Sequence, residues 1–174
     1  MFDKPEICGK CGGSCCKHKP GYFFPEDIKG PCVKKTITEM LRSKKVILDW
    51  CPPNKPDWDN PRSPEEMMDV YVLSPNVISC DHSSPLHRNT VFVPLWSGQC
   101  IFLTDQGCQL PSDERPLQCK LLEPVEGFPK GCIVHRKDDT TKYDCAKAWA
   151  PYNDALKEIG DLVEAELYGK KQGA

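Results

Sequence analysis

Four cysteines lie within nine residues near the start of the chain, in the segment Cys8-Gly9-Lys10-Cys11-Gly12-Gly13-Ser14-Cys15-Cys16. Two thiols separated by two residues can converge on one metal, because the loop between them turns both sulfurs inward while its amides point at them. Glycine permits positive φ angles and a close approach of backbone N–H groups to sulfur. We therefore expect a metal–thiolate site here, with Gly12, Gly13 and Lys17 in contact with the bound cofactor.

The adjacent pair Cys15-Cys16 has a different geometry from the CxxC spacing before it. Neighbouring side chains diverge, so two adjacent thiols rarely complete one tetrahedron together. These two cysteines are expected to serve different sites or one polynuclear cluster.

A second group of cysteines lies in the C-terminal half, and none of its members has tight ligand spacing. From spacing alone each is either a metal ligand or an ordinary buried thiol. The group consists of Cys100, Cys108, Cys119, Cys132 and Cys145.

The other cysteines and two histidines have weaker patterns. We favour core thiols for Cys32, Cys51, Cys80 and Cys132. His82 and His87, near Cys80, are further candidate ligands, although a single histidine is more often exposed or hydrogen-bonded.

Composition and compartment favour metal over disulfides. The chain has 12 cysteines in 174 residues and a net charge of −2. Charges and a proline occupy the first six residues, where a signal peptide needs an apolar stretch, and no window reaches membrane-spanning length. We expect a cytoplasmic protein without a membrane partner, in a reducing compartment where thiols are more often ligands than disulfides.

Positive charge is concentrated in residues 10–45, which carry nine Lys and Arg residues against three acids. A solvated face is the default interpretation. A second is that lysines offset the negative charge of metal-bound thiolates. Nucleic-acid binding is not expected, because the stretch lacks interleaved aromatic residues and the chain as a whole is acidic.

The elements that must hold these thiols are short. Pro25 followed by acids predicts a short helix. A capping box from Thr36 to Glu39 and an apolar stripe predict a helix over about 37–48. Residues 51–64 are a proline-rich loop, and Ser63 begins another short helix.

In the second half of the chain the spacing of apolar residues changes. Residues 90–96 and 100–104 are β-branched and aromatic runs that predict a hairpin near 90–104, with Pro94 on an edge strand. Apolar residues recur every three or four positions over about 151–168, ahead of Gly169, and predict an amphipathic helix whose apolar face covers the cysteine-rich part. The expected fold is α+β: one small, irregular, metal-braced domain over residues 1–174.

Four blocks of sequence, in this order and spacing, resemble the zinc- or iron-chelating cysteine-cluster (CxxCxxxCC) domain family. They are Cys8-x-x-Cys11-x-x-x-Cys15-Cys16, Gly98-x-Cys100 with Phe102-Leu103, Gly107-Cys108, and Arg115-Pro116-x-x-Cys119. The resemblance covers roughly residues 8–145, and members of the family share eight cysteines. Carried over, the metal ligands are Cys8, Cys11, Cys15, Cys16, Cys100, Cys108, Cys119 and, as the eighth, Cys145, with Cys132 as its rival.

Eight thiolates can form two four-cysteine centres. Zinc in such a site is redox-silent and stabilises the fold, whereas an iron–sulfur cluster adds electron transfer. Loop glycines and lysines slightly favour iron–sulfur, because inorganic sulfides also need N–H donors. We expect a metal-binding protein with a metal or electron relay or storage role, whose partners are metal ions, with a protein partner as a further candidate.

Two other classes stay open. One is a zinc-braced module that binds protein or nucleic acid. The other is an iron–sulfur-dependent enzyme, since some relatives carry the name flagellin lysine N-methylase. The sequence has no glycine-rich nucleotide loop after a strand, no HExxH and no GxSxG, so it does not decide whether the protein is an enzyme.

Overall fold

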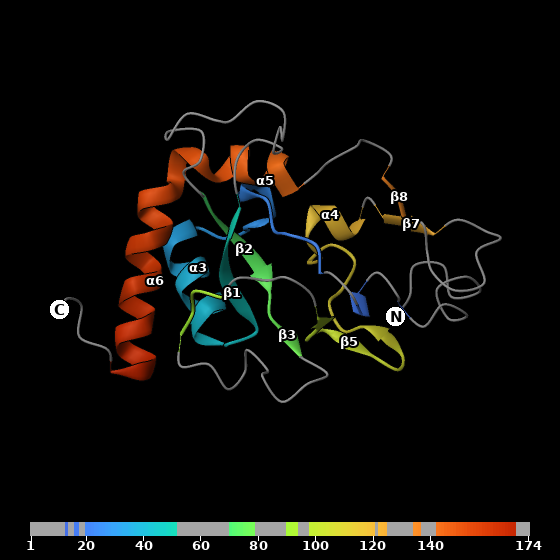
Figure 1. Ribbon diagram of the computed structural model, residues 1–174, viewed down its shortest axis with the longest axis horizontal. Helices are drawn as coiled ribbons and strands as arrows, with labels where there is room; N and C mark the ends of the chain where they lie inside the picture. Colours follow the sequence, from blue (N-terminus) through green and yellow to red (C-terminus); the bar gives the residue numbers. More distant parts are fainter. Residues whose placement is uncertain are drawn as a thin grey trace, which may run out of the picture.

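The computed structural model describes residues 13, 16–17, 20–51, 70–78, 90–93, 98–120, 122–124, 134–136 and 142–169. In these residues short helices surround several two-stranded antiparallel sheets (Figure 1). The fold is α+β, as the sequence predicts. No described helix has the length and apolar character needed to cross a membrane.

Helices lie toward both ends of the described chain, and the strands lie between them with one short helix, Leu117–Lys120, among them. The helical elements are η1 (Pro25–Asp27), α3 (Val33–Arg42), α4 (Leu117–Lys120), α5 (Lys142–Trp149), η3 (Ala150–Tyr152) and α6 (Asn153–Tyr168). The strands are β1 (Val46–Cys51), β2 (Val70–Pro75), β3 (Val77–Ile78), β4 (Gln99–Cys100), β5 (Leu103–Thr104), β6 (Gly107–Cys108), β7 (Leu122–Pro124) and β8 (Val134–Arg136).

The β1–β2 ladder is the centre of the main core. Its register pairs Leu48 with Leu73, and both side chains are fully buried. Each strand also has a neighbour on its outer edge: Phe92 bridges Leu48 in parallel and Phe23 bridges Leu73 in antiparallel orientation. Both edges of this small sheet are therefore paired. Helices α3, α5 and α6 also contact its strands, so nearly every residue of β1 and β2 is buried rather than every second one.

Helices α3 and α6 pack side by side against this sheet (Figure 1). In α6 the buried residues are Leu156, Ile159, Gly160 and Val163, which fall on one helical face. Gly160 lies so close to the sheet that a Cβ atom there would meet Leu48 Cδ1 at 2.5 Å and Phe92 Cζ at 2.6 Å. The absence of a side chain at this position sets how closely α6 approaches β1.

The predicted helix over about 37–48 is wrong in its bounds. α3 begins after Cys32 and ends at Arg42, and the residues from Val46 onward form β1. Lys44, with a φ of 59°, reverses the chain between the two elements. Strand β1, which begins with the β-branched residues Val46 and Ile47, pairs with β2. This pairing stabilises the strand more than the helical spacing of its apolar residues favours a helix. The predicted capping box is also absent, because Thr36 lies inside the helix and its hydroxyl donates to the Cys32 carbonyl.

The predicted hairpin between residues 90–96 and 100–104 is also wrong in its pairing. In the described residues Phe92 bridges Leu48, and β4 pairs with β3 so that Cys100 lies opposite Val77. A tighter hairpin joins β5 to β6 through Asp105 and Gln106. The Gly107 φ of 100° permits this turn, which the pattern of apolar residues does not predict.

Two predicted helices are confirmed. The short helix after Phe24 is η1, and the C-terminal helix is α6, which ends at Gly169 with a left-handed φ of 63°. The apolar face of α6 packs into the main core, which includes Cys51 and Cys145, whereas Cys100 lies in a second, smaller cluster.

Other predictions fall outside the described residues. The proline-rich loop begins at Cys51, which is the last residue of β1, and positions 52–64 are not described. The short helix at Ser63 and the edge position of Pro94 lie outside them as well.

Replacing Gly160 by leucine is expected to lower the free energy of unfolding by about 1–3 kcal/mol, because the added side chain overpacks the contact with Leu48 and Phe92. Ala155→Leu places the same strong helix former on the exposed face of α6 and is the matched control. Urea unfolding of both variants measures the difference. Equal stabilities of the two variants would contradict the close packing of α6.

Candidate metal centre

The structure brings cysteines from two distant parts of the sequence into one cluster. Cys100 is buried with Phe102 and Leu103, and both Cys16 and Cys108 are half-buried against them. Cys16 belongs to the N-terminal CxxCxxxCC segment, and the other two thiols belong to the second group. Three of the four sequence blocks therefore meet in space.

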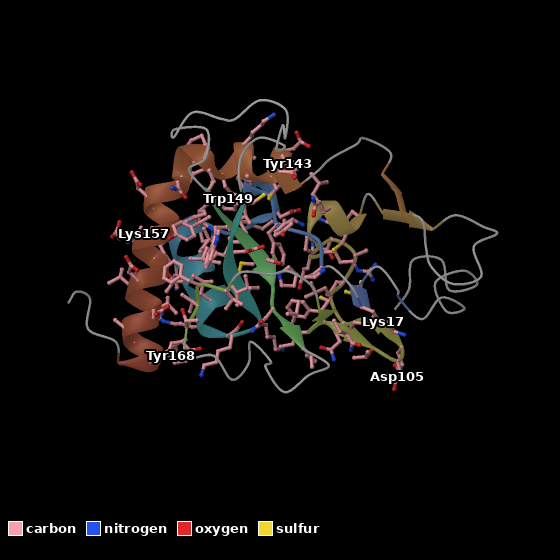
Figure 2. The ribbon with its side chains drawn as sticks, in the orientation of Figure 1. Lys17, Asp105, Tyr143, Trp149, Lys157 and Tyr168 are labelled. Atoms are coloured by element: carbon pink, nitrogen blue, oxygen red, sulfur yellow. The ribbon has the colours of Figure 1, made fainter. Side chains whose placement is uncertain are left out.

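The N-terminal member is held by a single turn of backbone. The amides of Cys16 and Lys17 both donate to the Gly13 carbonyl, at 2.9 and 3.1 Å. Gly13 has a φ of 72°, which favours glycine and agrees with the expected role of the loop glycines. Figure 2 shows Lys17 on the same side of the molecule as Asp105 in the β5–β6 turn, away from Trp149 in the main core.

The second pair of thiols is positioned by the short sheets. Cys100 ends β4, and the next amide, of Ile101, donates to the Asn76 carbonyl at 2.9 Å. Cys108 ends β6 opposite Leu103, and the amide of Gln109 donates to the Phe102 carbonyl at 2.8 Å. These backbone bonds fix both thiols relative to the same apolar side chains.

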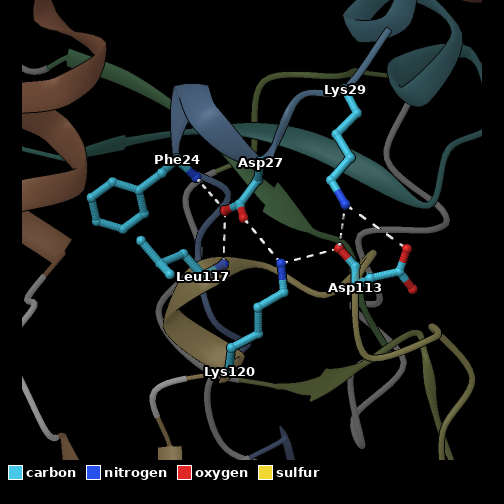
Figure 3. Close-up of polar contacts among 6 residues, drawn as sticks. All are labelled: Phe24, Asp27, Lys29, Asp113, Leu117 and Lys120. Carbon is cyan, nitrogen blue, oxygen red and sulfur yellow. Dashed lines mark hydrogen bonds and ion pairs between the residues drawn. The ribbon is translucent and has the colours of Figure 1, made fainter.

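Cys119 lies on α4, a single turn that depends on Asp27. The Asp27 carboxylate accepts a hydrogen bond from the Leu117 amide at 2.7 Å, at the start of α4, and another from the Phe24 amide at 2.9 Å (Figure 3). Lys120 Nζ lies 3.5 Å from the same carboxylate, whose side chain is only 5% exposed. One side chain thus ties α4 to η1.

Gly21 is a site residue that the sequence analysis did not identify. A Cβ atom at Gly21 would lie 2.7 Å from Cys119 Sγ, closer than any real contact of that kind. Next to it, the Tyr22 amide donates to the Gln118 side-chain oxygen at 2.8 Å. The chain at residues 20–22 therefore lies directly against the thiol of Cys119, and a glycine outside any motif gives no sequence signal for such an approach.

Cys145, the predicted eighth ligand, lies in a different environment. It is fully buried in the main core, and its Sγ donates to the Phe23 carbonyl at 3.3 Å, which also accepts the Trp149 indole N–H at 2.7 Å. Burial, and then the nearby Cys51, raise the pKa of the Cys145 thiol well above its ordinary range. The fold therefore favours the protonated thiol, and ligation by Cys145 requires a metal to displace that proton.

A buried polar pair lies near these core thiols. The Tyr22 hydroxyl donates to Asp49 Oδ2 at 2.9 Å, and both side chains are buried. Burial first, then the charge of Asp49 and its hydrogen bond, raise the pKa of Tyr22 far above its usual range. Tyr22 thus shares this buried carboxylate with the Trp50 amide, which donates to Asp49 Oδ1 at 2.8 Å.

The structure places only some of the remaining candidate residues. Cys51 is buried, which confirms its prediction as a core thiol, whereas Cys32 is exposed at the N-terminus of α3 and corrects the same prediction there. The other candidates lie outside the described residues: Cys8, Cys11, Gly12, Cys15, Cys80, His82, His87 and Cys132. In the part of the chain that the structure describes, no three Cys, His, Asp or Glu side chains are grouped so as to hold a metal ion.

Comparison with known proteins adds no relative. No family model, curated protein or solved structure matches the chain. The resemblance to the cysteine-cluster family therefore rests on the four sequence blocks.

Replacing Asp27 by alanine is expected to lower the free energy of unfolding by about 2 kcal/mol, because the Phe24 and Leu117 amides lose their shared acceptor. The control is Asp113→Ala, which removes an exposed carboxylate lying 3.8 Å from Lys29 and should change stability by less than about 1 kcal/mol. Chemical denaturation of both variants checks this, and equal losses would contradict the role of Asp27.

The raised pKa of Cys145 predicts a loss of stability at high pH. Above the ordinary cysteine value of 9.0 the unfolded chain releases the proton while the folded chain retains it, so the free energy of unfolding falls as the pH rises. The expected slope from this group is about 1.4 kcal/mol per pH unit.

Cys145→Ala should lack this component. Denaturation of the wild type and the variant in reducing buffer, at several pH values on either side of 9.0, measures the difference in slope. Identical slopes would mean that Cys145 is already a thiolate in the folded protein, as a metal ligand is.

Proposed function

We propose that the protein binds an iron–sulfur cluster or zinc through its cysteines and acts in metal or electron relay or in metal storage. The observation that supports this most directly is the packing of Cys16 against the cluster that contains Cys100 and Cys108. Thiols from the N-terminal block and from the two middle blocks of the sequence pattern lie on the same apolar side chains. A centre formed there joins the N-terminal segment to the short sheets.

The surroundings of these thiols are suited to a thiolate-bound metal. Cys100 is buried while Cys16 and Cys108 are half-buried, so the site is partly shielded from water yet open enough for a metal to enter. Lys17, beside Cys16, supplies positive charge to offset thiolates. The proposal requires Cys8, Cys11 and Cys15 to complete the ligand set, since the described thiols do not form a group of three.

The same cysteine side chains have different roles in a zinc centre and in an iron–sulfur cluster. With zinc, four thiolates form a closed centre whose binding free energy is folding free energy. With an iron–sulfur cluster, the thiolates hold iron while backbone and side-chain N–H groups tune the reduction potential. In both cases the residues of this chain hold the metal, limit its access to water and offset its charge.

The surface charges count against nucleic-acid binding by the basic stretch. Lys34 Nζ lies 2.9 Å from Glu158, and Arg42 makes a two-bond ion pair with Glu166 at 2.7 and 2.8 Å. These exposed pairs dock α3 on α6 and place acids beside the bases. The expected solvated face is thus present, and much of its charge is matched.

Protein purified without oxygen is expected to contain metal in a fixed ratio to the chain. Iron with acid-labile sulfide and a brown colour is the expected result for a cluster; a colourless protein with stoichiometric zinc identifies the structural alternative. Elemental analysis and visible spectroscopy make the distinction. Metal-free protein that retains its fold would contradict the proposal.

Single serine replacements of Cys16, Cys100 and Cys108 should each lower the metal content, because a hydroxyl is a poor substitute for a thiolate ligand. Cys32→Ser is the matched control, since Cys32 is exposed and serine is a favourable residue at its helix N-terminus. Its metal content should equal that of the wild type. Wild-type metal content in the Cys16, Cys100 and Cys108 variants alike would contradict the proposed centre.

A further inference from the structure

The side chain of Gln118 contains a buried hydrogen-bond donor that the fold leaves unused. Gln118 is 5% exposed, and its Nε2 has no hydrogen-bond partner in the described part of the chain. Leaving a buried amide N–H unpaired costs about 1–3 kcal/mol, and native proteins rarely do so. Such a group therefore indicates an acceptor that the described residues do not supply.

The orientation of this amide is fixed by its other end. The Tyr22 backbone N–H, which can only donate, lies 2.8 Å from the Gln118 side-chain oxygen. Oxygen and nitrogen of the amide therefore cannot be exchanged without placing two donors against each other. The Nε2 group of Gln118 must therefore point away from the Tyr22 amide.

Gln118 immediately precedes Cys119, a predicted ligand, on α4. Gln118 Cβ and Cys119 Sγ lie 3.0 and 2.7 Å from the same point, the site of a Cβ atom on Gly21. The carboxylate of Asp27 and the Tyr22 amide hold α4 from two directions. The donor is thus carried on a fixed turn, next to a half-buried thiol.

We propose that Gln118 donates its side-chain N–H to a sulfur atom of the metal centre that Cys119 helps to form. The acceptor is a thiolate in a zinc centre, and a thiolate or an inorganic sulfide in a cluster. A negatively charged sulfur in a shielded site gains from such a donor, which stabilises the charge and orients the ligand. Gln118 is therefore a positioning residue of the centre, an inference that rests on the proposed function.

The structure offers two informative substitutions at this position. Gln118→Glu keeps an oxygen for the Tyr22 amide but replaces the donor with an acceptor, and Gln118→Met keeps the approximate volume without either polar atom. Gln109 provides matched controls, because it is exposed and follows Cys108 as Gln118 precedes Cys119. The set therefore comprises Glu and Met variants at both positions.

The test measures metal retention by the proteins as isolated without oxygen, using competition with a chelator for the bound iron or zinc. Both Gln118 variants should release metal about 10-fold to 100-fold more readily than the wild type, the usual effect of losing an outer-shell partner. For a cluster, the visible spectrum and reduction potential should change as well. The Gln109 variants should behave as the wild type.

Each alternative outcome has a distinct signature. A structural role alone lowers the stability of the Gln118 variants while metal affinity, spectrum and potential stay at wild-type values, and that result overturns the inference. A bridging water as the true acceptor gives the same unchanged metal affinity and overturns it too. Wild-type protein without metal overturns the proposed function itself, and that measurement is made before any variant is needed.

Discussion

The carboxylate of Asp27 joins two parts of the chain that are otherwise far apart in sequence. It lies in η1 and accepts the amides of Phe24 and Leu117, while Lys120 approaches from the end of α4 (Figure 3). A four-residue helix has no independent stability, so α4 exists because this acceptor satisfies its first turn. The positions of Gln118 and Cys119 follow from that contact. The tight approach of Gly21 to the Cys119 thiol adds the second restraint.

The fold divides its described cysteines between two physical environments. Cys51 and Cys145 lie in the main apolar core, where burial favours neutral thiols. Cys16, Cys100 and Cys108 lie on a smaller cluster formed by short sheets and one backbone turn. The main core packs many apolar side chains between α3, α6 and the β1–β2 ladder. The smaller cluster has few apolar side chains, so the proposed metal would add stability where packing adds least.

Charge and hydrogen bonding support the same division. Ion pairs between α3 and α6 match much of the exposed positive charge on the side of the main core. On the other side, Lys17 follows Cys16 in the chain, and the buried N–H group of Gln118, the residue before Cys119, has no hydrogen-bond acceptor among the described residues. Donors and positive charge beside thiols are what a thiolate-bound centre requires.

The sequence by itself determined the fold class and the C-terminal helix, and its cysteine spacing is the basis of the proposed thiol chemistry. Local signals carry these features: a strong apolar period ending at Gly169, proline followed by acids at Pro25, and the spacing of Cys8, Cys11, Cys15 and Cys16. Tertiary structure alone decided the partners. Val46 to Leu48 fit a helical stripe equally well, but pairing with β2 made them a strand. Cys100 pairs with Val77 rather than with the preceding run, and Cys145 lies in the main core rather than with Cys100 and Cys108. Gly21, Asp27 and Gln118 had no motif, because their roles come from contacts with residues distant in the sequence, and local spacing contains no information about such contacts.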